Sequence, residues 1–435
     1  MIQKRHRQPV LRMMVALLSF LMTCSIGTAF SAALKPSSLR TSTLLRAGSN
    51  PVGDASELTS ALARLDQQWT IQQSGKGPRS RWSKLVLPQD PNEQVEEQAP
   101  GAAVELKPEE FVWLLEPPSN TIPSCIIVFT GGAGLGQFPH IAYNQLLSRV
   151  SDRLNAAVVS APYSIGLDHF SLAKQTGERL RRALLFCEDD PSRQYPASIP
   201  TYSLGHSLGC KLQTIYMGAT GQDYEGIGFM SFNNFSFGKT ISMGRMFAEE
   251  LRKNSGMGGA IPNIPFGAAL GNEEMLNTFF SFAENAIGAI GLDFSPNAQD
   301  TERLIQMKYD DVLQRKTRLF VFDEDNLDNS KEFVDNCTGG PGPSASGLPG
   351  GHLSPVYFKL GFDDLEDVPQ EMKEMAKEAA NGFESASFGD EEKLNDLVDE
   401  VCAWILGKGP SRGPNWDAAA RNEPPMLEAF SSATQ

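Results

Sequence analysis

The stretch from residue 203 to residue 210 constrains this chain more than any other. It reads Ser-Leu-Gly-His-Ser-Leu-Gly-Cys and contains the pentapeptide Gly-x-Ser-x-Gly, with Ser207 at its centre. In such a motif the serine occupies a sharp turn between a strand and a helix, and its hydroxyl projects from the edge of a sheet. Strand and helix approach closely there, so Gly205 and Gly209 leave the space that side chains would fill.

The residues around the motif decide whether it is this turn, because an ordinary Gly-Ser turn is the alternative in a glycine-rich chain. Residues 201–205 form a short β-prone run after a proline-rich loop. In residues 211–217 the apolar side chains Leu212, Ile215 and Tyr216 follow the i, i+3, i+4 spacing of a helix. The context therefore predicts a strand before Ser207 and a helix after it.

The rest of the chain alternates between strand and helix patterns, which is typical of a parallel sheet with helices on both faces. A stretch of helical patches without a strand, about 238–309, interrupts this order and is predicted to be a cap. With the serine turn, the pattern predicts an α/β-hydrolase fold: a mostly parallel central sheet, helices on both faces and a helical cap insertion. The expected strands are 111–115, 125–130, 156–160, 201–205, 226–231 and 317–322, and the expected helices are 140–154, 170–187, 211–217 and 391–406.

A serine hydroxyl becomes a nucleophile only when an imidazole takes its proton and a carboxylate orients the imidazole. In this fold the order along the chain is serine, acid, histidine. His352, in a Gly/Pro loop, is the only histidine after the motif, and its alternative role is that of a surface loop residue. Asp325 follows the strand 317–322 by one turn and is the expected acid, with Asp328 as the alternative.

The tetrahedral intermediate of acyl transfer needs two backbone N–H donors. Leu208, directly after the nucleophile, should supply one, and either Gly132 or Ala133 the other, from the glycine loop 131–136. A phosphate-binding turn is the alternative for this loop. It lacks the Gly-x-Gly-x-x-Gly spacing and a following Gly-Lys-Ser/Thr, so no nucleotide, other cofactor or metal is expected.

The N-terminal residues have the pattern of a targeting presequence. Residues 1–53 contain no acidic residue, and a basic segment precedes the short apolar core 13–22. Small residues suitable for signal cleavage end at Ala29, with Phe30 next, and a stretch rich in Ser, Thr, Ala and Arg follows. This arrangement resembles the bipartite presequence of complex algal plastids, with secretion as the alternative. The five cysteines after the presequence show no paired spacing and are expected to be free thiols, which fits a reducing compartment.

Beyond the presequence we expect an N-terminal extension, 54–108, a hydrolase domain, 109–408, and a disordered tail, 409–435. The net charge is −14 although residues 1–53 are basic, so the body is strongly acidic. An acidic body argues against nucleic-acid binding. The sequence does not determine the oligomeric state.

The motifs together resemble the plant and cyanobacterial family of unknown function DUF1350, within the α/β-hydrolase superfamily. The resemblance implies the fold and an association with plastids, but no substrate. The acid motif of the family resembles Asp-Asp-x-Ile-Asp; here residues 324–328 read Glu-Asp-Asn-Leu-Asp, which favours Asp325. The matching segments are Phe-Thr-Gly-Gly-Ala (129–133), Ala-Pro-Tyr-Ser-Ile-Gly-Leu-Asp-His (161–169), Gly-His-Ser-Leu-Gly-Cys-Lys-Leu (205–212), Ser-Phe-Asn-Asn-Phe (231–235), Phe-Ser-Pro (294–296) and Gly-His-Leu-Ser-Pro-Val (351–356).

The sequence thus predicts a plastid serine hydrolase that cleaves an ester or related acyl bond. The apolar cap favours a lipid-like or other hydrophobic acyl substrate and allows peripheral contact with a membrane. The alternative is an inactive protein of the same fold, in which residues 233–235 and the Phe-rich cap bind a plastid membrane or a protein partner.

Overall fold

The computed structural model describes residues 62–63, 66, 69–70, 81–88, 110–119, 122–193, 195–240, 293–361 and 385–416. The presequence, most of the predicted cap and residues 417–435 lie outside the described residues. For residues 358–361 and 385–388 only the backbone is described.

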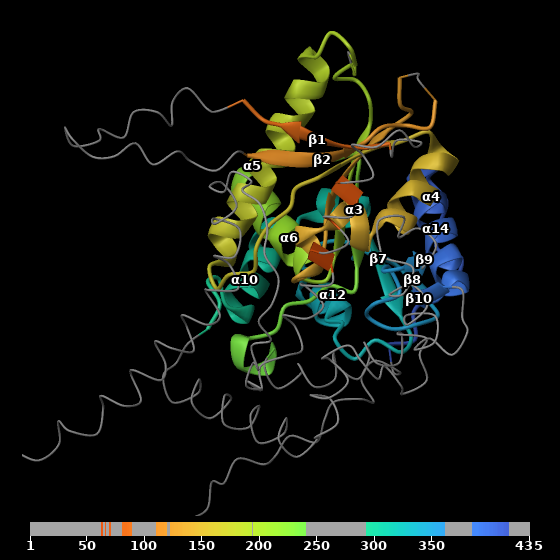
Figure 1. Cartoon of the computed structure of the whole chain (residues 1–435). Helices are drawn as coiled ribbons and strands as arrows, with labels where there is room; N and C mark the ends of the chain where they lie inside the picture. The colour runs from red at the N-terminus through yellow and green to blue at the C-terminus, as the bar shows by residue number, and fades with distance from the viewer. Residues whose placement is uncertain are drawn as a thin grey trace, which may run out of the picture.

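The centre of the molecule is an eight-stranded sheet in the order β1-β2-β4-β3-β5-β6-β7-β8 (Figure 1). The pairs from β4 to β8 are parallel, whereas β1 and β2 are antiparallel to their neighbours. The strands are β1 (Trp82–Val86), β2 (Phe111–Leu115), β3 (Ile126–Thr130), β4 (Ala157–Ser160), β5 (Thr201–His206), β6 (Gly226–Met230), β7 (Thr317–Phe322) and β8 (Ser344–Leu348). A separate antiparallel pair joins β9 (Phe358–Gly361) and β10 (Ser385–Phe388).

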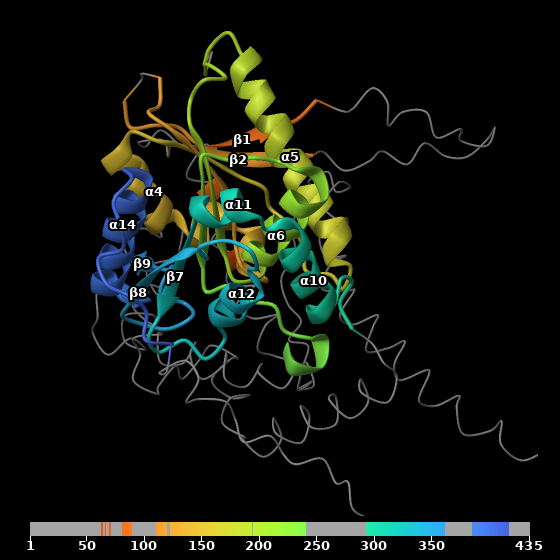
Figure 2. The ribbon, with the colours of Figure 1, turned by 180° about the vertical axis from the view of Figure 1, so that it is seen from behind.

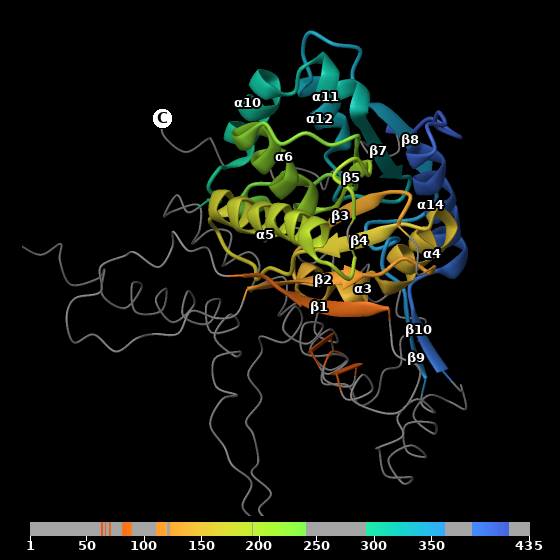
Figure 3. The same cartoon turned by 90° about the horizontal axis from the view of Figure 1, so that it is seen from above.

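Helices cover both faces of the sheet, as the view from above shows (Figure 3). On one face, α4 (Asn144–Leu154) and α14 (Glu391–Ile405) lie side by side; on the other lie α5 (His169–Asp189), α6 (Leu208–Thr220), α10 (Ala298–Lys308), α11 (Asp311–Lys316) and α12 (Ser330–Asn336). Figure 2 shows α10 and α12 grouped beside α6. The short α3 (Pro139–Ala142) and the 3-10 turn η2 (Leu135–Gln137) follow β3.

The core forms because the central strands are apolar on both sides. All five residues of β3 and all five of β6 are buried. Side chains of α4 and α14 pack on one side of the sheet and those of α5, α6 and α12 on the other. Such two-sided burial is what makes a parallel strand read as a continuous apolar run rather than an alternating one.

These observations confirm the predicted fold class and correct several details. Residues 82–86, within the expected extension 54–108, form the edge strand β1 of the main sheet. Residues 298–308, counted in the cap, form α10, which packs beside α6 and α12. The expected tail is ordered as far as residue 416, since the Arg412 carbonyl accepts the Gly347 N–H at 2.8 Å and Trp416 packs on the core.

Candidate active site

Ser207 lies between β5 and α6 in the predicted strained turn. Its φ of +55° and ψ of −123° are rare for a residue with a side chain. A Cβ on Gly209 would lie 2.1 Å from the Thr130 carbonyl oxygen, and one on Gly205 would lie 2.8 Å from Gln213 Oε1. Close packing therefore requires glycine at both positions. The sequence motif predicted this, because strand and helix approach closely at such a turn.

Three strands of the parallel part of the sheet place the predicted triad residues at its carboxyl edge; β7 and β8 are neighbours, and β6 lies between β5 and β7. Ser207 follows β5, Asp325 follows β7 and His352 follows β8. His352 Nε2 lies 2.9 Å from Ser207 Oγ. His352 Nδ1 lies 3.0 Å from Asp325 Oδ2 and 3.2 Å from Oδ1. The structure thus brings the three residues together, although 145 residues separate Ser207 from His352 along the chain.

Asp325 is held as an ionised acceptor. It is buried, and its Oδ1 also accepts the Leu327 N–H at 2.7 Å. Burial alone would raise its pKa, but the charge of His352 and the hydrogen bonds from His352 and Leu327 outweigh burial and keep the pKa of Asp325 below its ordinary value. The Glu324 N–H donates to the Gly350 carbonyl at 2.8 Å, which ties the acid loop to the histidine loop.

Asp328, the alternative acid, does not contact the imidazole. Its Oδ1 accepts the Ser330 N–H at 2.8 Å, and its Oδ2 is shielded from solvent without a hydrogen-bond partner among the described residues. Burial, reinforced by the negative charge of Asp325, raises the pKa of Asp328 to about 8. The geometry therefore favours Asp325, and Asp328 is a neutral neighbour at physiological pH.

The glycine loop after β3 lies directly against the nucleophile. A Cβ on Gly132 would be 3.2 Å from Ser207 Cβ. The Gly132 N–H, however, donates to the Tyr143 hydroxyl at 2.8 Å and is already engaged. The Leu208 N–H, in the first turn of α6, and the Ala133 N–H donate to no other group in the described part of the chain. Of the three residues predicted to bind the oxyanion, Leu208 and Ala133 thus have backbone N–H groups that are available to it.

His206, which the sequence placed inside the turn without a role, connects the two halves of the site. Its Nε2 lies 2.8 Å from the His352 carbonyl oxygen, which can only accept, so Nε2 carries the proton. Its Nδ1 lies 2.8 Å from the Tyr143 hydroxyl and accepts from it. Burial, with the nearby charge of His352, lowers the pKa of His206 to about 3, which keeps the ring neutral.

A continuous path of hydrogen bonds therefore runs from the Gly132 N–H through Tyr143 and His206 to the backbone of His352. Sequence reasoning missed Tyr143, since a tyrosine on an amphipathic helix reads as an ordinary core residue. The signal available was His206 itself, a buried polar residue in a strand that would need two partners.

The family described as "Protein of unknown function (DUF1350)" matches residues 109–374, more than half of the chain. The chain belongs to the DUF1350 family. Among curated proteins, none matches this DUF1350 chain.

Solved structures similar to this DUF1350 protein are α/β-hydrolases. A 2,6-dihydroxy-pseudo-oxynicotine hydrolase is 11% identical over 81% of this chain and 76% of its own, with a TM-score of 0.41. An esterase from Rhizomucor miehei is 12% identical over 81% of this chain and 100% of its own, with a TM-score of 0.36. A carboxyl esterase from Bacillus coagulans is 11% identical over 75% of this chain and 98% of its own, with a TM-score of 0.36. At such identities the comparisons concern the fold, and we derive no substrate from them.

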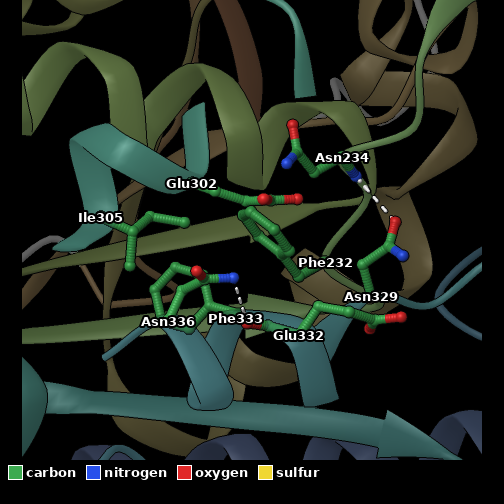
Figure 4. Close-up of a pocket in the computed structure, with 8 residues that line it drawn as sticks. All are labelled: Phe232, Asn234, Glu302, Ile305, Asn329, Glu332, Phe333 and Asn336. Atoms are coloured by element: carbon green, nitrogen blue, oxygen red, sulfur yellow. Dashed lines mark hydrogen bonds between the residues drawn. The ribbon is translucent and has the colours of Figure 1, made fainter. Parts of the chain in front are cut away.

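A small pocket of the DUF1350 protein opens between α10 and α12 (Figure 4). None of the predicted catalytic or oxyanion residues lines it. Two of its asparagine side chains bond within its own wall: Asn329 Oδ1 accepts the Asn234 N–H, and Asn336 Nδ2 donates to the Glu332 carbonyl. We therefore do not assign the substrate to it. The lining residues are Phe232, Asn234, Glu302, Ile305, Asn329, Glu332, Phe333 and Asn336.

Within the described residues, no three His, Cys, Asp or Glu side chains converge as ligands of a metal ion. No helix in the described ranges combines the length and the apolar content needed to cross a bilayer.

Proposed function

We propose that this protein is a serine hydrolase that cleaves an ester or a related acyl bond. The observation that carries the proposal is the unbroken contact from Ser207 Oγ to His352 Nε2, 2.9 Å, and from His352 Nδ1 to Asp325, 3.0 Å. These distances are the ones that proton transfer between nucleophile and base requires.

In the proposed reaction, Ser207 Oγ attacks the carbonyl carbon of the substrate while His352 Nε2 takes the hydroxyl proton. Asp325 accepts the Nδ1–H and stabilises the imidazolium that forms. The N–H groups of Leu208 and Ala133 receive the oxyanion. His352 then returns its proton to the leaving alcohol or thiol, and the acyl-enzyme is hydrolysed by water through the same steps in the opposite direction.

The contacts of residues 233–235 favour catalysis over the alternative of an inactive binding protein. Asn233 Nδ2 donates to the Leu327 carbonyl at 3.1 Å, and Asn234 Nδ2 donates to the Ala298 carbonyl at 3.0 Å. Phe235 is buried. Asn233 thus holds the loop after β6 to the segment that carries Asp325, and Asn234 holds it to the start of α10, so these amide N–H groups are used inside the fold rather than offered to a partner.

Labelling by a fluorophosphonate probe tests the proposal. The purified protein should be labelled, and Ser207→Ala should abolish the signal; Ser203→Ala, a buried serine on the same strand, is the matched control and should keep it. Labelling that persists in Ser207→Ala would refute the assignment of the nucleophile.

We further propose a plastid location, which rests on residues 1–53 alone. Fusion of these residues to a fluorescent protein in an alga with a complex plastid should direct it to that organelle, and Phe30→Ala should retain it outside. Secretion of the fusion would instead support the alternative.

A further inference from the structure

A second cluster of buried polar groups lies beside the triad. Lys211 is in the first turns of α6 and His169 is the first residue of α5. Lys211 is 1% exposed and His169 is 2% exposed. Among the described residues, no hydrogen-bond partner is available to Lys211 Nζ or to either ring nitrogen of His169. Buried polar groups are otherwise almost always paired, so this cluster calls for a cause.

The ring of Phe294 joins the two side chains. His169 stacks on it with centroids 4.1 Å apart, and Lys211 Nζ lies 5.6 Å from its centroid. The backbone fixes this arrangement: the Phe170 N–H donates to the Ser295 carbonyl at 2.8 Å, and the Ser295 N–H donates to the Leu167 carbonyl at 2.9 Å. The main chain therefore fixes His169 and Phe294 relative to each other, and Lys211 Nζ lies over the Phe294 ring.

The one carboxylate that acts on Lys211 does not neutralise it by contact. Asp293 is exposed, and its Oδ1 accepts the N–H groups of Phe237 and Phe294 at 2.7 and 2.8 Å. Burial lowers the pKa of Lys211 to about 8, against the opposing charge of Asp293, so the ammonium is still mostly charged at neutral pH. Burial and the charge of Lys211 lower the pKa of His169 to about 3, so its ring is neutral.

The cluster thus carries one positive charge that no group on the described chain pairs. A buried, unpaired ammonium is costly, and a protein retains such a group where a ligand supplies the counter-charge. Lys211 follows Ser207 by four residues, which places it about 6 Å along the helix axis from the nucleophile. A group bound at Lys211 is therefore within reach of an acyl chain that Ser207 attacks.

We propose that Lys211 and His169 bind a carboxylate at the far end of the acyl group, so that the preferred substrates are half-esters of dicarboxylic acids or similar carboxylate-bearing acyl compounds. This inference rests on the proposed hydrolase function and specifies its substrate class. One ammonium matches the single charge of a carboxylate, the neutral imidazole offers a second N–H, and Phe294 forms an apolar wall. A phosphate dianion would require more donors than these two side chains supply.

The test compares two esters that differ only at the end of the acyl chain: p-nitrophenyl valerate and mono-p-nitrophenyl glutarate. With the full chain, the ratio of kcat/KM for the glutarate over the valerate ester should fall roughly 10- to 100-fold in Lys211→Met, as expected when a charged hydrogen-bond partner is lost. Lys174→Met, the same change at an exposed position of α5, is the matched control and should leave the ratio unchanged. An unchanged ratio in Lys211→Met would overturn the carboxylate site.

A binding experiment separates this inference from hydrolysis. In Ser207→Ala, free glutarate should raise the melting temperature at constant ionic strength, whereas neutral glutaramide should not. The double variant with Lys211→Met should lose the shift. A glutarate shift without any ester hydrolysis by the wild type would keep the carboxylate site and overturn the hydrolase. Hydrolysis with no glutarate shift would keep the hydrolase and overturn the site.

Discussion

The triad and the Lys211 cluster are both buried polar groups next to the same turn, but they use their hydrogen-bonding capacity differently. His352 contacts a partner at each ring nitrogen, and His206 beside it does the same. Lys211 Nζ and both ring nitrogens of His169 have none within the described chain. His169, His206 and His352 are each at most 3% exposed, so the contrast does not follow from depth of burial.

This difference distinguishes the proposed catalytic residues from the proposed binding site at Lys211. A fully paired network holds its members in one geometry before substrate arrives, which is the requirement for a nucleophile and a base. Unpaired groups lower stability and gain their partners only when a ligand binds. Four substitutions test this contrast, beginning with the one expected to reduce activity most.

The largest effect should follow from the loss of the carboxylate that orients His352. Asp325→Asn keeps the size of the side chain but no longer favours the Nδ1–H tautomer, so kcat for p-nitrophenyl valerate should fall about 10⁴-fold. Asp396→Asn, at an exposed position on α14, is the matched control and should keep full activity. A fall of less than tenfold in Asp325→Asn would mean that Asp325 does not orient His352.

Stability should fall when the hydrogen-bond path through Tyr143 is broken. Tyr143→Phe leaves the Gly132 N–H and His206 Nδ1 unpaired in a buried site, which should lower the free energy of unfolding by about 1–3 kcal/mol. Chemical denaturation measures this. Tyr224→Phe, a buried tyrosine for which no hydroxyl hydrogen bond is found in the described chain, should change the stability much less. Equal effects of the two variants would argue against a specific role of the path.

In the Lys211 cluster, loss of a polar group should change the free energy of unfolding in the opposite direction. Lys211→Met keeps the length of the side chain and removes a buried charge without a partner, so it should raise the free energy of unfolding by about 1–2 kcal/mol at pH 7. Lys174→Met should leave the stability unchanged. If Lys211→Met instead lowered the melting temperature, the ammonium would be a structural group and the contrast between the two regions would disappear.

The last comparison concerns Asp328, a buried carboxylate next to the triad whose Oδ2 has no hydrogen-bond partner in the described chain. Its pKa is about 8 in the folded protein and about 4 in an unfolded chain, so between these values the folded state holds a proton that the unfolded state has lost. Stability should therefore fall as the pH rises from about 4 to 8. Asp328→Asn should remove this dependence, so its gain in stability should be larger at pH 8 than near pH 4.

Thermal unfolding between pH 4 and pH 9 measures the Asp328 effect, with Asp396→Asn as the control. A wild-type slope that persists in Asp328→Asn would assign the titration to another group.

The bounds of a strand could be predicted from the sequence wherever the strand is apolar on both faces. Strand 317–322 was predicted with the bounds of β7, and the strands β2 to β6 within one residue. β8 was missed because residues 344–348 read Ser-Ala-Ser-Gly-Leu, which has little strand character. Its small residues serve packing: a Cβ on Gly347 would lie 2.5 Å from the Gly413 carbonyl oxygen of the C-terminal segment.

Local sterics and hydrophobic periodicity act over a few residues, so the chain's pattern alone was enough to predict the turn at Ser207, the apolar strands β2 to β7 and the short set of residues that could act with the serine. Folding in three dimensions settles which carboxylate meets His352, which N–H groups near the nucleophile stay available, and that Lys211 lies buried without a hydrogen-bond partner in the described part of the chain. Each of those depends on groups from distant parts of the chain meeting at distances near 3 Å, which no local pattern encodes.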